Sequence, residues 1–389
     1  MNQEAKKQYL KSIQERYRAA EKKDKKLILD EFVSICKFNR KYAIGLISGR
    51  RIIGTKKAGR KPRYGDDLIP HIRFLWLAME QISSRRMHAA IPLWMPFYSK
   101  NKEAPPLSPN QKFQLLKISA STLNRYFKKI RGTLKGLSST KPNLILKNNI
   151  PIQTNDYHVK RPGHFQADTV AHCGNSLAGN FANSLTMTDV ASSWTENRAT
   201  WTKDSKEIRL AIQDIEKHLP FTLRGFASDC GSEFLNYRVM NYLQGDHRKE
   251  KVFMSRSRPY QKNDNAYVEQ KNWTHVRTLF GYDRIEDPSL IPLMNEIYTN
   301  FWNPLNNFFL PSMKLESKTR IGGHLQKKHD KPQTPFQRIL NSADVSSEQK
   351  EKLKLRFSVL DPFLLKRDLE SKLNLFFKLL NQAPLKKAS

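Results

Sequence analysis

The sequence predicts an α/β protein built on a mixed five-stranded sheet with flanking helices, set between all-α modules and a small C-terminal β and helical region. Residues 165–171 alternate between the two faces of a strand. The elements that follow, as far as residue 280, read as strand, strand, helix, strand, helix, strand and helix. Before residue 138 and after residue 346, apolar residues recur at helical spacing, so these segments are predicted to be helical.

The charge of the chain indicates what it binds. Lysine and arginine outnumber aspartate and glutamate by 68 to 36, which gives a formal net charge of +32. An excess of this size favours a polyanionic partner, most commonly nucleic acid. No run of about 18 apolar residues is present, so no membrane partner is expected. Three scattered cysteines argue for a reducing compartment, and we expect a cytoplasmic, nucleoid-associated protein.

Residues 1–50 are predicted to form a helix-turn-helix module. Apolar residues recur at helical spacing in residues 25–38, and a short break precedes a second helix that opens with Arg40 and Lys41. The second helix of such a module can enter the major groove, which makes Arg40 and Lys41 candidate DNA contacts. An ordinary helical hairpin is the alternative.

Residues 51–65 form a basic linker that contains Arg60, Lys61 and Arg63. Such an arm can follow phosphates or lie in a minor groove, although a merely solvated linker has the same composition.

A second helical DNA-binding module is predicted for residues 66–137. Residues 69–81 are apolar at helical spacing, and a Pro-rich stretch from Pro92 to Pro109 is expected to interrupt the helices. The helix that begins near Ser119 would bury its apolar face. It would leave four basic residues for DNA: Arg125, Lys128, Lys129 and Arg131.

Three acidic residues stand out in the predicted sheet domain, residues 156–310, which follows a linker at residues 138–155. Asp168 lies within the first strand, where an aspartate is locally unfavourable and a functional role is therefore favoured. Asp229 ends the strand predicted for residues 221–228. Glu269 lies on the helix that is expected to begin near Asp264.

The segments around these acids resemble the catalytic core of DDE transposases and retroviral-type integrases, particularly those of bacterial insertion sequences. The order Asp, Asp, Glu holds, with separations of 61 and 40 residues, within the loose spacing of that family. One departure is Cys230, where the family usually has Asn; another is the absence of the His-His-Cys-Cys zinc module of retroviral integrases. The resembling segments are Pro162-Gly163 with Asp168-Thr169, Ser228-Asp229-Cys230-Gly231-Ser232-Glu233-Phe234, and Arg258-Pro259-Tyr260 through Asn265-Ala266-Tyr267-Val268-Glu269.

The resemblance implies a ribonuclease-H-like fold and a metal site. Three converging carboxylates repel one another unless a cation lies between them, and Mg²⁺ prefers oxygen ligands. We expect two Mg²⁺ ions, with Mn²⁺ able to substitute, of which Asp168 bridges both while Asp229 and Glu269 each hold one. Two such ions suit phosphodiester cleavage by water and then attack by the exposed 3′-hydroxyl on target DNA.

Other residues of the sheet domain compete for these roles or surround them. Asp189 at the end of the second strand, Glu233 in the first turn of a helix expected to begin near Gly231, and Asp264 at the start of the last helix of this domain are alternative acids. Trp273, on that last helix, is expected to lie in the core. Lys262, Lys271 and Arg277 are candidate DNA contacts near the site, and a solvated basic surface is the alternative for each.

After the sheet domain, residues 311–335 are predicted to form a small basic β module and residues 336–389 to form helices. The last, long amphipathic helix is expected either to join subunits or to pack on its own domain.

The predicted function is that of a transposase or integrase-type recombinase that binds element ends and target duplex DNA, acting as a homo-oligomer. The alternatives are a DNA-binding regulator or domesticated transposase that keeps the fold without strand transfer, and a plain metal-dependent nuclease. The sequence leaves the need for a partner ATPase open.

Overall fold

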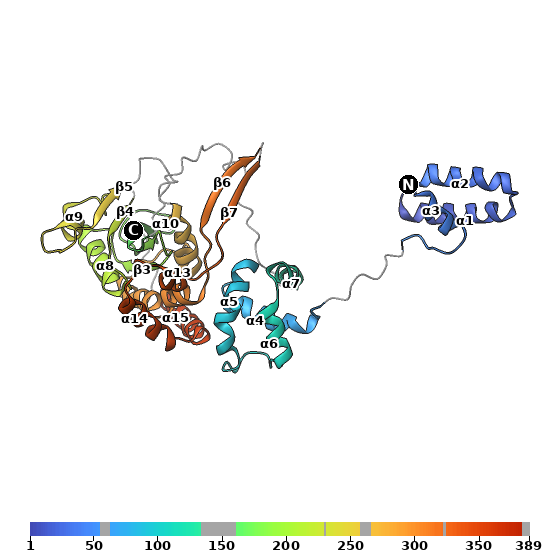
Figure 1. Cartoon of the computed structure of the whole chain (residues 1–389). Helices are drawn as coiled ribbons and strands as arrows, with labels where there is room; N and C mark the ends of the chain where they lie inside the picture. The colour runs from blue at the N-terminus through green and yellow to red at the C-terminus, as the bar shows by residue number, and fades with distance from the viewer. Residues whose placement is uncertain (55–62, 134–160, 229–230, 257–265, 322–323, 383–389) are drawn as a thin grey trace. The chain divides into compact units, whose positions relative to one another are not determined.

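The computed structural model describes residues 1–54, 63–133, 161–228, 231–256, 266–321 and 324–382 (Figure 1). Contacts between residues divide the chain into two compact units, Met1–Gly65 and Asp66–Ser389. None of the helices in these residues is long and apolar enough to cross a membrane.

The first unit consists of the helices α1 (Gln3–Ala19), α2 (Lys22–Cys36) and α3 (Arg40–Ile47). Helix α2 ends where Lys37 adopts a left-handed conformation with φ of 56°. The Asn39 side chain then caps α3 by accepting a hydrogen bond from the Lys41 backbone N–H at 3.0 Å. Phe32 and Leu46 are fully buried between the helices. The predicted succession of helix, short turn and basic helix is confirmed.

The second unit opens with the helices α4 (Ile69–Ala78), α5 (Ser84–Tyr98), α6 (Pro109–Lys117) and α7 (Ala120–Thr133). The predicted interruption at Pro92 is wrong, because α5 continues through both Pro92 and Pro96. A proline inside a helix costs about 3 kcal/mol. Both prolines lie on the exposed face, while Trp94 and Tyr98 of the same helix are fully buried. Burial of these large aromatic side chains offsets the cost.

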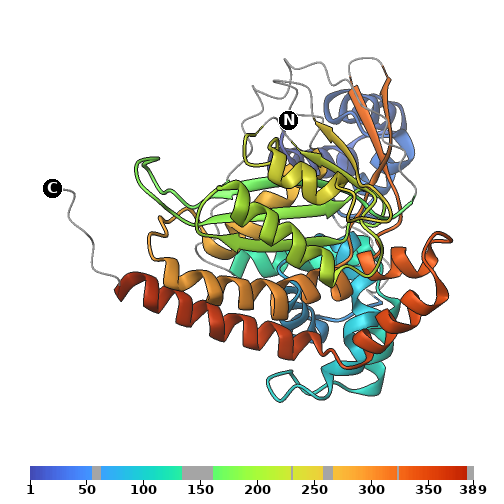
Figure 2. The same cartoon turned by 90° about the vertical axis from the view of Figure 1, so that its left-hand side faces the viewer.

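The sheet contains β1 (His164–Ala171), β2 (Asn183–Asp189), β3 (Thr195–Thr200), β4 (Gly225–Ser228) and β5 (Phe253–Arg256) in the order β3-β2-β1-β4-β5. The first three strands are antiparallel neighbours, whereas β4 runs parallel to β1 and β5 parallel to β4. Helices α8 (Ser205–His218) and α9 (Tyr237–Gln244) flank it (Figure 2). The predicted mixed five-stranded sheet is confirmed, and its topology is compatible with a ribonuclease-H-like fold.

Two boundaries in this domain differ from the prediction. Strand β4 begins at Gly225 rather than at Phe221. Helix α9 begins at Tyr237, because the Asn236 side chain accepts a hydrogen bond from the Val239 N–H at 3.0 Å and caps the helix there. Glu233 therefore precedes the helix instead of lying in its first turn.

A continuous helical segment follows β5. It comprises α10 (Ala266–Lys271), a π-helical stretch η3 (Asn272–Arg277) and α11 (Thr278–Phe280). Helix α12 (Ile291–Glu296) continues through the π-helical segments η5 (Ile297–Trp302) and η6 (Leu305–Phe309), which are rich in buried aromatic residues.

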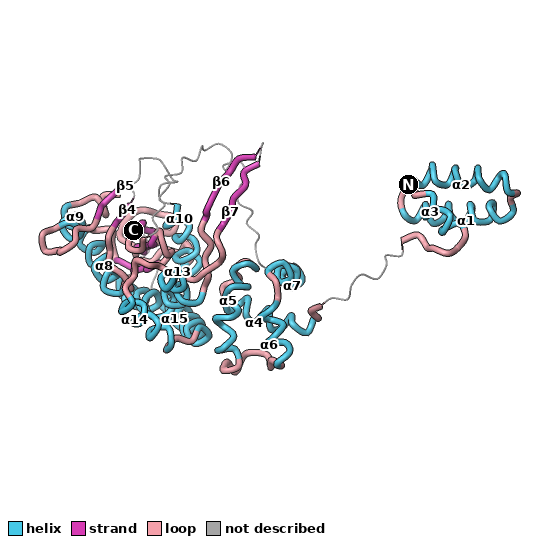
Figure 3. Tube along the Cα trace, viewed as in Figure 1, coloured by secondary structure: helices cyan, strands magenta, loops and turns pink. Residues whose placement is uncertain are grey.

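The C-terminal region contains the ribbon β6 (Leu315–Ile321) and β7 (His324–His329), then α13 (Pro335–Asn341), α14 (Ser347–Ser358) and α15 (Pro362–Gln382) (Figure 3). Phe376 of α15 packs on Phe280, with ring centroids 4.9 Å apart. Phe363 of α15 packs on Trp94 of α5 at 5.0 Å. Helix α15 thus joins the helices before the sheet to those after it within one unit.

Candidate active site

Asp168 lies in the central strand of the sheet, beside the point where the chain leaves β4. The parallel register pairs Ala167 of β1 with Ser228, the last residue of β4. Asp168 is the next residue along β1, and Asp229 is the next residue of the sequence after Ser228. Asp229 itself lies outside the described residues.

The Asp168 carboxylate is half-buried and held from two sides. Its Oδ1 accepts a hydrogen bond from the Thr169 backbone N–H at 2.8 Å. Its Oδ2 accepts one from Nδ2 of Asn272 at 2.6 Å. Asn272 is the first residue after α10, so this bond fixes the end of that helix against β1.

Glu269 is brought to the same part of the sheet by the same helix. It is exposed and lies three residues before Asn272 on α10, which packs against β1 and β2. Side chains three residues apart share one face of a helix. The Asn272–Asp168 hydrogen bond therefore anchors α10 to β1 one helical turn after Glu269.

The carboxylate side chains in this part of the sheet domain, those of Asp168 and Glu269, suit a hard cation. Carboxylate oxygens are the ligands that Mg²⁺ prefers, and a few of them suffice because the ion keeps several waters. Within the part of the chain that the structure describes, no three His, Cys, Asp or Glu side chains are grouped closely enough to hold a metal. The third predicted ligand, Asp229, is not among those residues.

Asp189, a competing acid, is a structural residue. It is fully buried at the end of β2. Its Oδ1 accepts from the backbone N–H groups of Gly163 at 2.8 Å and His164 at 3.1 Å. Its Oδ2 accepts from the Ser192 N–H at 2.7 Å and hydroxyl at 2.6 Å. Burial raises the pKa of Asp189, and these hydrogen bonds act in the opposite direction.

The other two competing acids are placed differently. Oε1 of Glu233 accepts a hydrogen bond from the Thr169 hydroxyl at 3.0 Å and lies 3.4 Å from the Lys203 ammonium. Glu233 is therefore linked to β1 through Thr169. The Thr169 side chain points to the face of β1 opposite to that of Asp168, which contacts Asn272. Asp264 lies outside the described residues.

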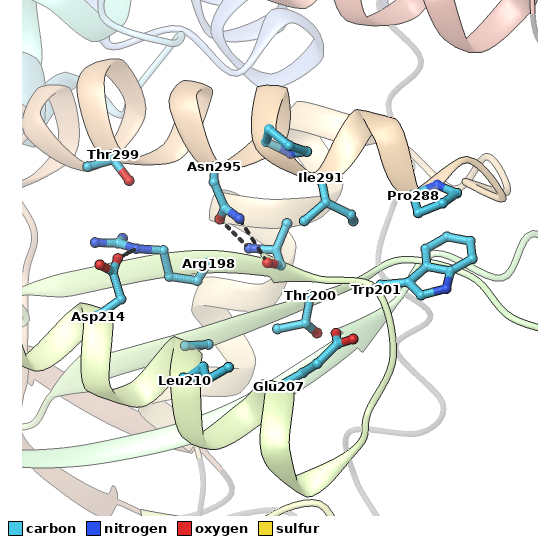
Figure 4. A pocket seen from close by; sticks show the side chains of 13 residues that line it. Arg198, Thr200, Trp201, Glu207, Leu210, Asp214, Pro288, Ile291, Asn295 and Thr299 are labelled. Atoms are coloured by element: carbon cyan, nitrogen blue, oxygen red, sulfur yellow. Dashed lines mark hydrogen bonds and ion pairs between the residues drawn. The ribbon is translucent and has the colours of Figure 1, made fainter.

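A separate pocket lies between β3, α8 and α12, and neither Asp168 nor Glu269 lines it (Figure 4). There Asn295 accepts from the Ala199 N–H at 2.8 Å and donates to the Ala199 carbonyl at 3.0 Å. The Asn295 amide thereby pairs with the outward-facing backbone groups of Ala199 on the edge strand β3. Unpaired backbone groups on an edge strand can otherwise pair with another strand.

Comparison with known proteins identifies one relative over most of the chain. No protein-family model matches the sequence. The sequence is 32% identical over 332 residues to "Uncharacterized protein y4rM" of Sinorhizobium fredii, covering 85% of this chain and 93% of that protein. The chain belongs to the y4rM family. Among solved structures, the catalytic core domain of BIV integrase is similar to 49% of this y4rM-family chain and 98% of that domain, with 16% identity and a TM-score of 0.28.

The predicted DNA contacts in the first unit of this y4rM-family protein differ in their surroundings. Arg40 forms an ion pair with Asp30 of α2, so its guanidinium is partly neutralised. Lys41 is exposed at the start of α3. Arg63 is exposed near the Tyr64 ring. Arg60 and Lys61 lie outside the described residues.

In α7, Arg125, Lys128 and Lys129 are all exposed. Arg125 donates a hydrogen bond to the Thr122 hydroxyl at 3.1 Å, and Lys129 pairs with Asp66. Neither Arg125 nor Lys128 forms an ion pair with a described residue.

The basic residues nearest to the acids are more enclosed than the sequence indicated. Lys271 is half-buried; burial, together with the nearby charges of Arg86 and Arg338, lowers its pKa to about 7. Arg277 donates to the backbone carbonyls of Ala171 at 3.0 Å and Gly281 at 3.3 Å. The hydrogen bond to Ala171 joins η3 to the end of β1. Lys262 lies outside the described residues.

Sequence reasoning missed Asn272 and misplaced Trp273. Asn272 could have been found from its position one helical turn after Glu269, where a side chain reaches the same surface. Trp273 was expected in the core, but it is 55% exposed. The π-helical stretch that begins at Asn272 changes the spacing of the buried positions that follow.

Proposed function

We propose that this protein is a DNA transposase of the DDE type, which cuts the ends of a DNA element and joins them to target DNA in a divalent-metal-dependent reaction. The observation that carries the proposal is the hydrogen bond between Asn272 and Asp168. It ties the helix of Glu269 to the strand of Asp168, next to the end of β4 that Asp229 follows.

Asp168, Asp229 and Glu269 would hold the metal. When bound, two Mg²⁺ ions activate the attacking oxygen and stabilise the leaving oxygen of the phosphodiester. The three carboxylates supply negative charge and oxygen donors, and Mn²⁺ satisfies the same requirements.

The neighbouring residues orient Asp168. The Thr169 N–H engages Oδ1 and the Asn272 amide engages Oδ2, so the carboxylate is held in one rotamer. A carboxylate oxygen can accept more than one bond, so each oxygen keeps capacity for a cation. This arrangement keeps the ligand in place before substrate arrives, which lowers the cost of assembling the site.

The partner in this proposal is duplex DNA, both the element ends and the target, bound by a homo-oligomer. The net charge of +32 supplies the attraction to phosphates. Among the described residues of the predicted set, the proposed DNA contacts are the exposed basic side chains that form no ion pair with a described residue: Lys41, Arg63, Arg125 and Lys128.

The test uses the full chain with duplex DNA that carries the terminal repeats flanking its coding region. We expect nicks that expose 3′-hydroxyl ends and then joined products in Mg²⁺ or Mn²⁺, and neither product in EDTA. Specific DNA binding without cleavage in either metal would indicate a DNA-binding regulator and overturn the proposal. Cleavage without joining would indicate a nuclease.

A further inference from the structure

The ribbon of β6 and β7 projects from the second unit with its strands exposed (Figures 1 and 2). Every residue of β7 is exposed, and the described side chains of β6 are exposed as well. A two-stranded hairpin with no packed face is marginally stable in water. Within the second unit, no described segment covers the two strands.

The stem of this ribbon, in contrast, is firmly held. Asp330 accepts a hydrogen bond from the Lys314 N–H at 2.7 Å and pairs with Arg338 of α13. Arg338 also donates to the Ser312 carbonyl at 3.0 Å. Arg86 of α5 donates to the Pro311 carbonyl at 2.5 Å. Because Arg86 and Arg338 both donate hydrogen bonds to the chain just before β6, the base of the ribbon is fixed to α5 and α13.

One face of the ribbon is cationic. The register places Arg320 opposite Leu325, and Lys327 lies two residues further along β7, so both basic residues share a face. Glu316, the one acid in the sequence of the two strands, lies 3.2 Å from Lys328. Arg320 and Lys327 have no acidic partner among the described contacts, which leaves their charges available to an anion.

The opposite face carries less positive charge. The register sets Thr319 opposite Gln326 and Ser317 opposite Lys328, whose ammonium pairs with Glu316, and the exposed His324 continues the same face. The face of Arg320 and Lys327 is therefore the one suited to phosphates.

We propose that the β6–β7 ribbon docks in the major groove of duplex DNA, with Arg320 and Lys327 on phosphates. Two strands about 4.8 Å apart fit a groove about 12 Å wide, which admits a two-stranded ribbon. The choice of DNA as partner rests on the proposed function; the ribbon as the docking element rests on its own exposure, register and charge.

The composition of the ribbon favours duplex DNA over other polyanionic partners. Residues 315–329 contain no Phe, Tyr or Trp. Aromatic side chains are the stacking platforms of proteins that bind single-stranded nucleic acid and the anchors of those that lie at membrane interfaces. A polar, cationic ribbon without them matches a groove lined by phosphates.

The experiment measures binding of the full chain to labelled duplex DNA in EDTA, so that no cleavage occurs. The variant carries Arg320→Gln and Lys327→Gln. Loss of two phosphate contacts makes the negative slope of log affinity against log salt shallower by about 2. The ratio of wild-type to variant affinity is then about 10-fold larger at about 50 mM than at about 200 mM salt. The control, Lys352→Gln with Lys354→Gln on exposed α14, removes the same charge and should keep the wild-type slope.

Two further measurements sharpen the result. Arg320→Lys with Lys327→Arg keeps both charges and should restore most of the binding. Duplex RNA of the same sequence has a narrow major groove that side chains cannot enter, so the Gln variant should bind it as the wild type does.

The outcomes separate this inference from the proposed function. If the wild type binds no duplex DNA, the proposed function fails. If it binds and the ribbon variant has an unchanged affinity and salt slope, the ribbon inference alone is overturned. An equal loss on duplex RNA also overturns docking in the major groove.

Discussion

Replacement of Asp168 by asparagine is expected to lower the rate of DNA cleavage and joining by about 10³-fold or more. Asparagine keeps the shape of the side chain but removes the negative charge that a cation requires. Metal stabilisation of a transition state is worth several kcal/mol, and each 1.36 kcal/mol is about tenfold in rate. Single-turnover rates with saturating DNA in Mg²⁺ measure the effect, together with the DNA affinity in EDTA, which should remain within about twofold of wild type because phosphate contacts dominate binding.

The matched control for this substitution is Asp246→Asn. Asp246 is almost fully exposed and paired with Lys251, so it offers the same loss of one charge away from the sheet edge. It should retain the wild-type rate. Strand transfer by the Asp168→Asn protein at the rate of this control would show that Asp168 has no role in the reaction.

Replacement of Asp189 by alanine is expected to destabilise the second unit by about 3–5 kcal/mol. The carboxylate accepts four hydrogen bonds in a fully buried position, and its removal leaves the N–H groups of Gly163, His164 and Ser192 without a partner. Each buried donor left unsatisfied costs about 1–3 kcal/mol, and partial relaxation reduces the sum. Urea unfolding monitored by tryptophan fluorescence measures the change, since Trp194 is buried nearby in sequence.

Asp189→Asn provides the comparison, because it keeps one acceptor oxygen and should lose less stability than alanine. Asp246→Ala, at the exposed position, should be close to neutral. If Asp189→Ala instead left stability unchanged and abolished DNA cleavage, Asp189 would belong to the catalytic set, and its assignment as a structural acid would be wrong.

The first strand could be predicted because residues 165–171 alternate in polarity, although Phe165, Gln166 and Ala167 are all buried and β2 and β3 are buried along their whole length. Asp204 begins α8 by accepting from the Lys206 N–H at 2.7 Å, as an N-cap aspartate does. The boundary of α9 was predicted less well, because Gly231 and Asn236 are both plausible starts and the Asn236 cap decides between them.

Tertiary packing decided what local pattern did not. Pro92 and Pro96 lie within α5 because buried residues hold the helix on both sides of them, Ile91 before Pro92 and Tyr98 after Pro96, with Trp94 between. The contact of Asn272 with Asp168 joins residues 104 positions apart; helical spacing puts Asn272 near Glu269, but nothing in the sequence identifies Asp168 as its partner. The predicted β module at residues 311–335 is a ribbon without a core of its own, since polar and charged residues occupy both faces.

The central claim is that Asp168 and Glu269, together with Asp229, converge on a divalent cation. Its most direct test is the anomalous scattering of Mn²⁺ in crystals of the full chain bound to duplex DNA. We expect two anomalous peaks, with the Asp168 carboxylate in contact with both and Asp229 and Glu269 each in contact with one, and the loss of these peaks in crystals of the Asp168→Asn protein. Carboxylates that point apart, with no Mn²⁺ between them, would contradict the account.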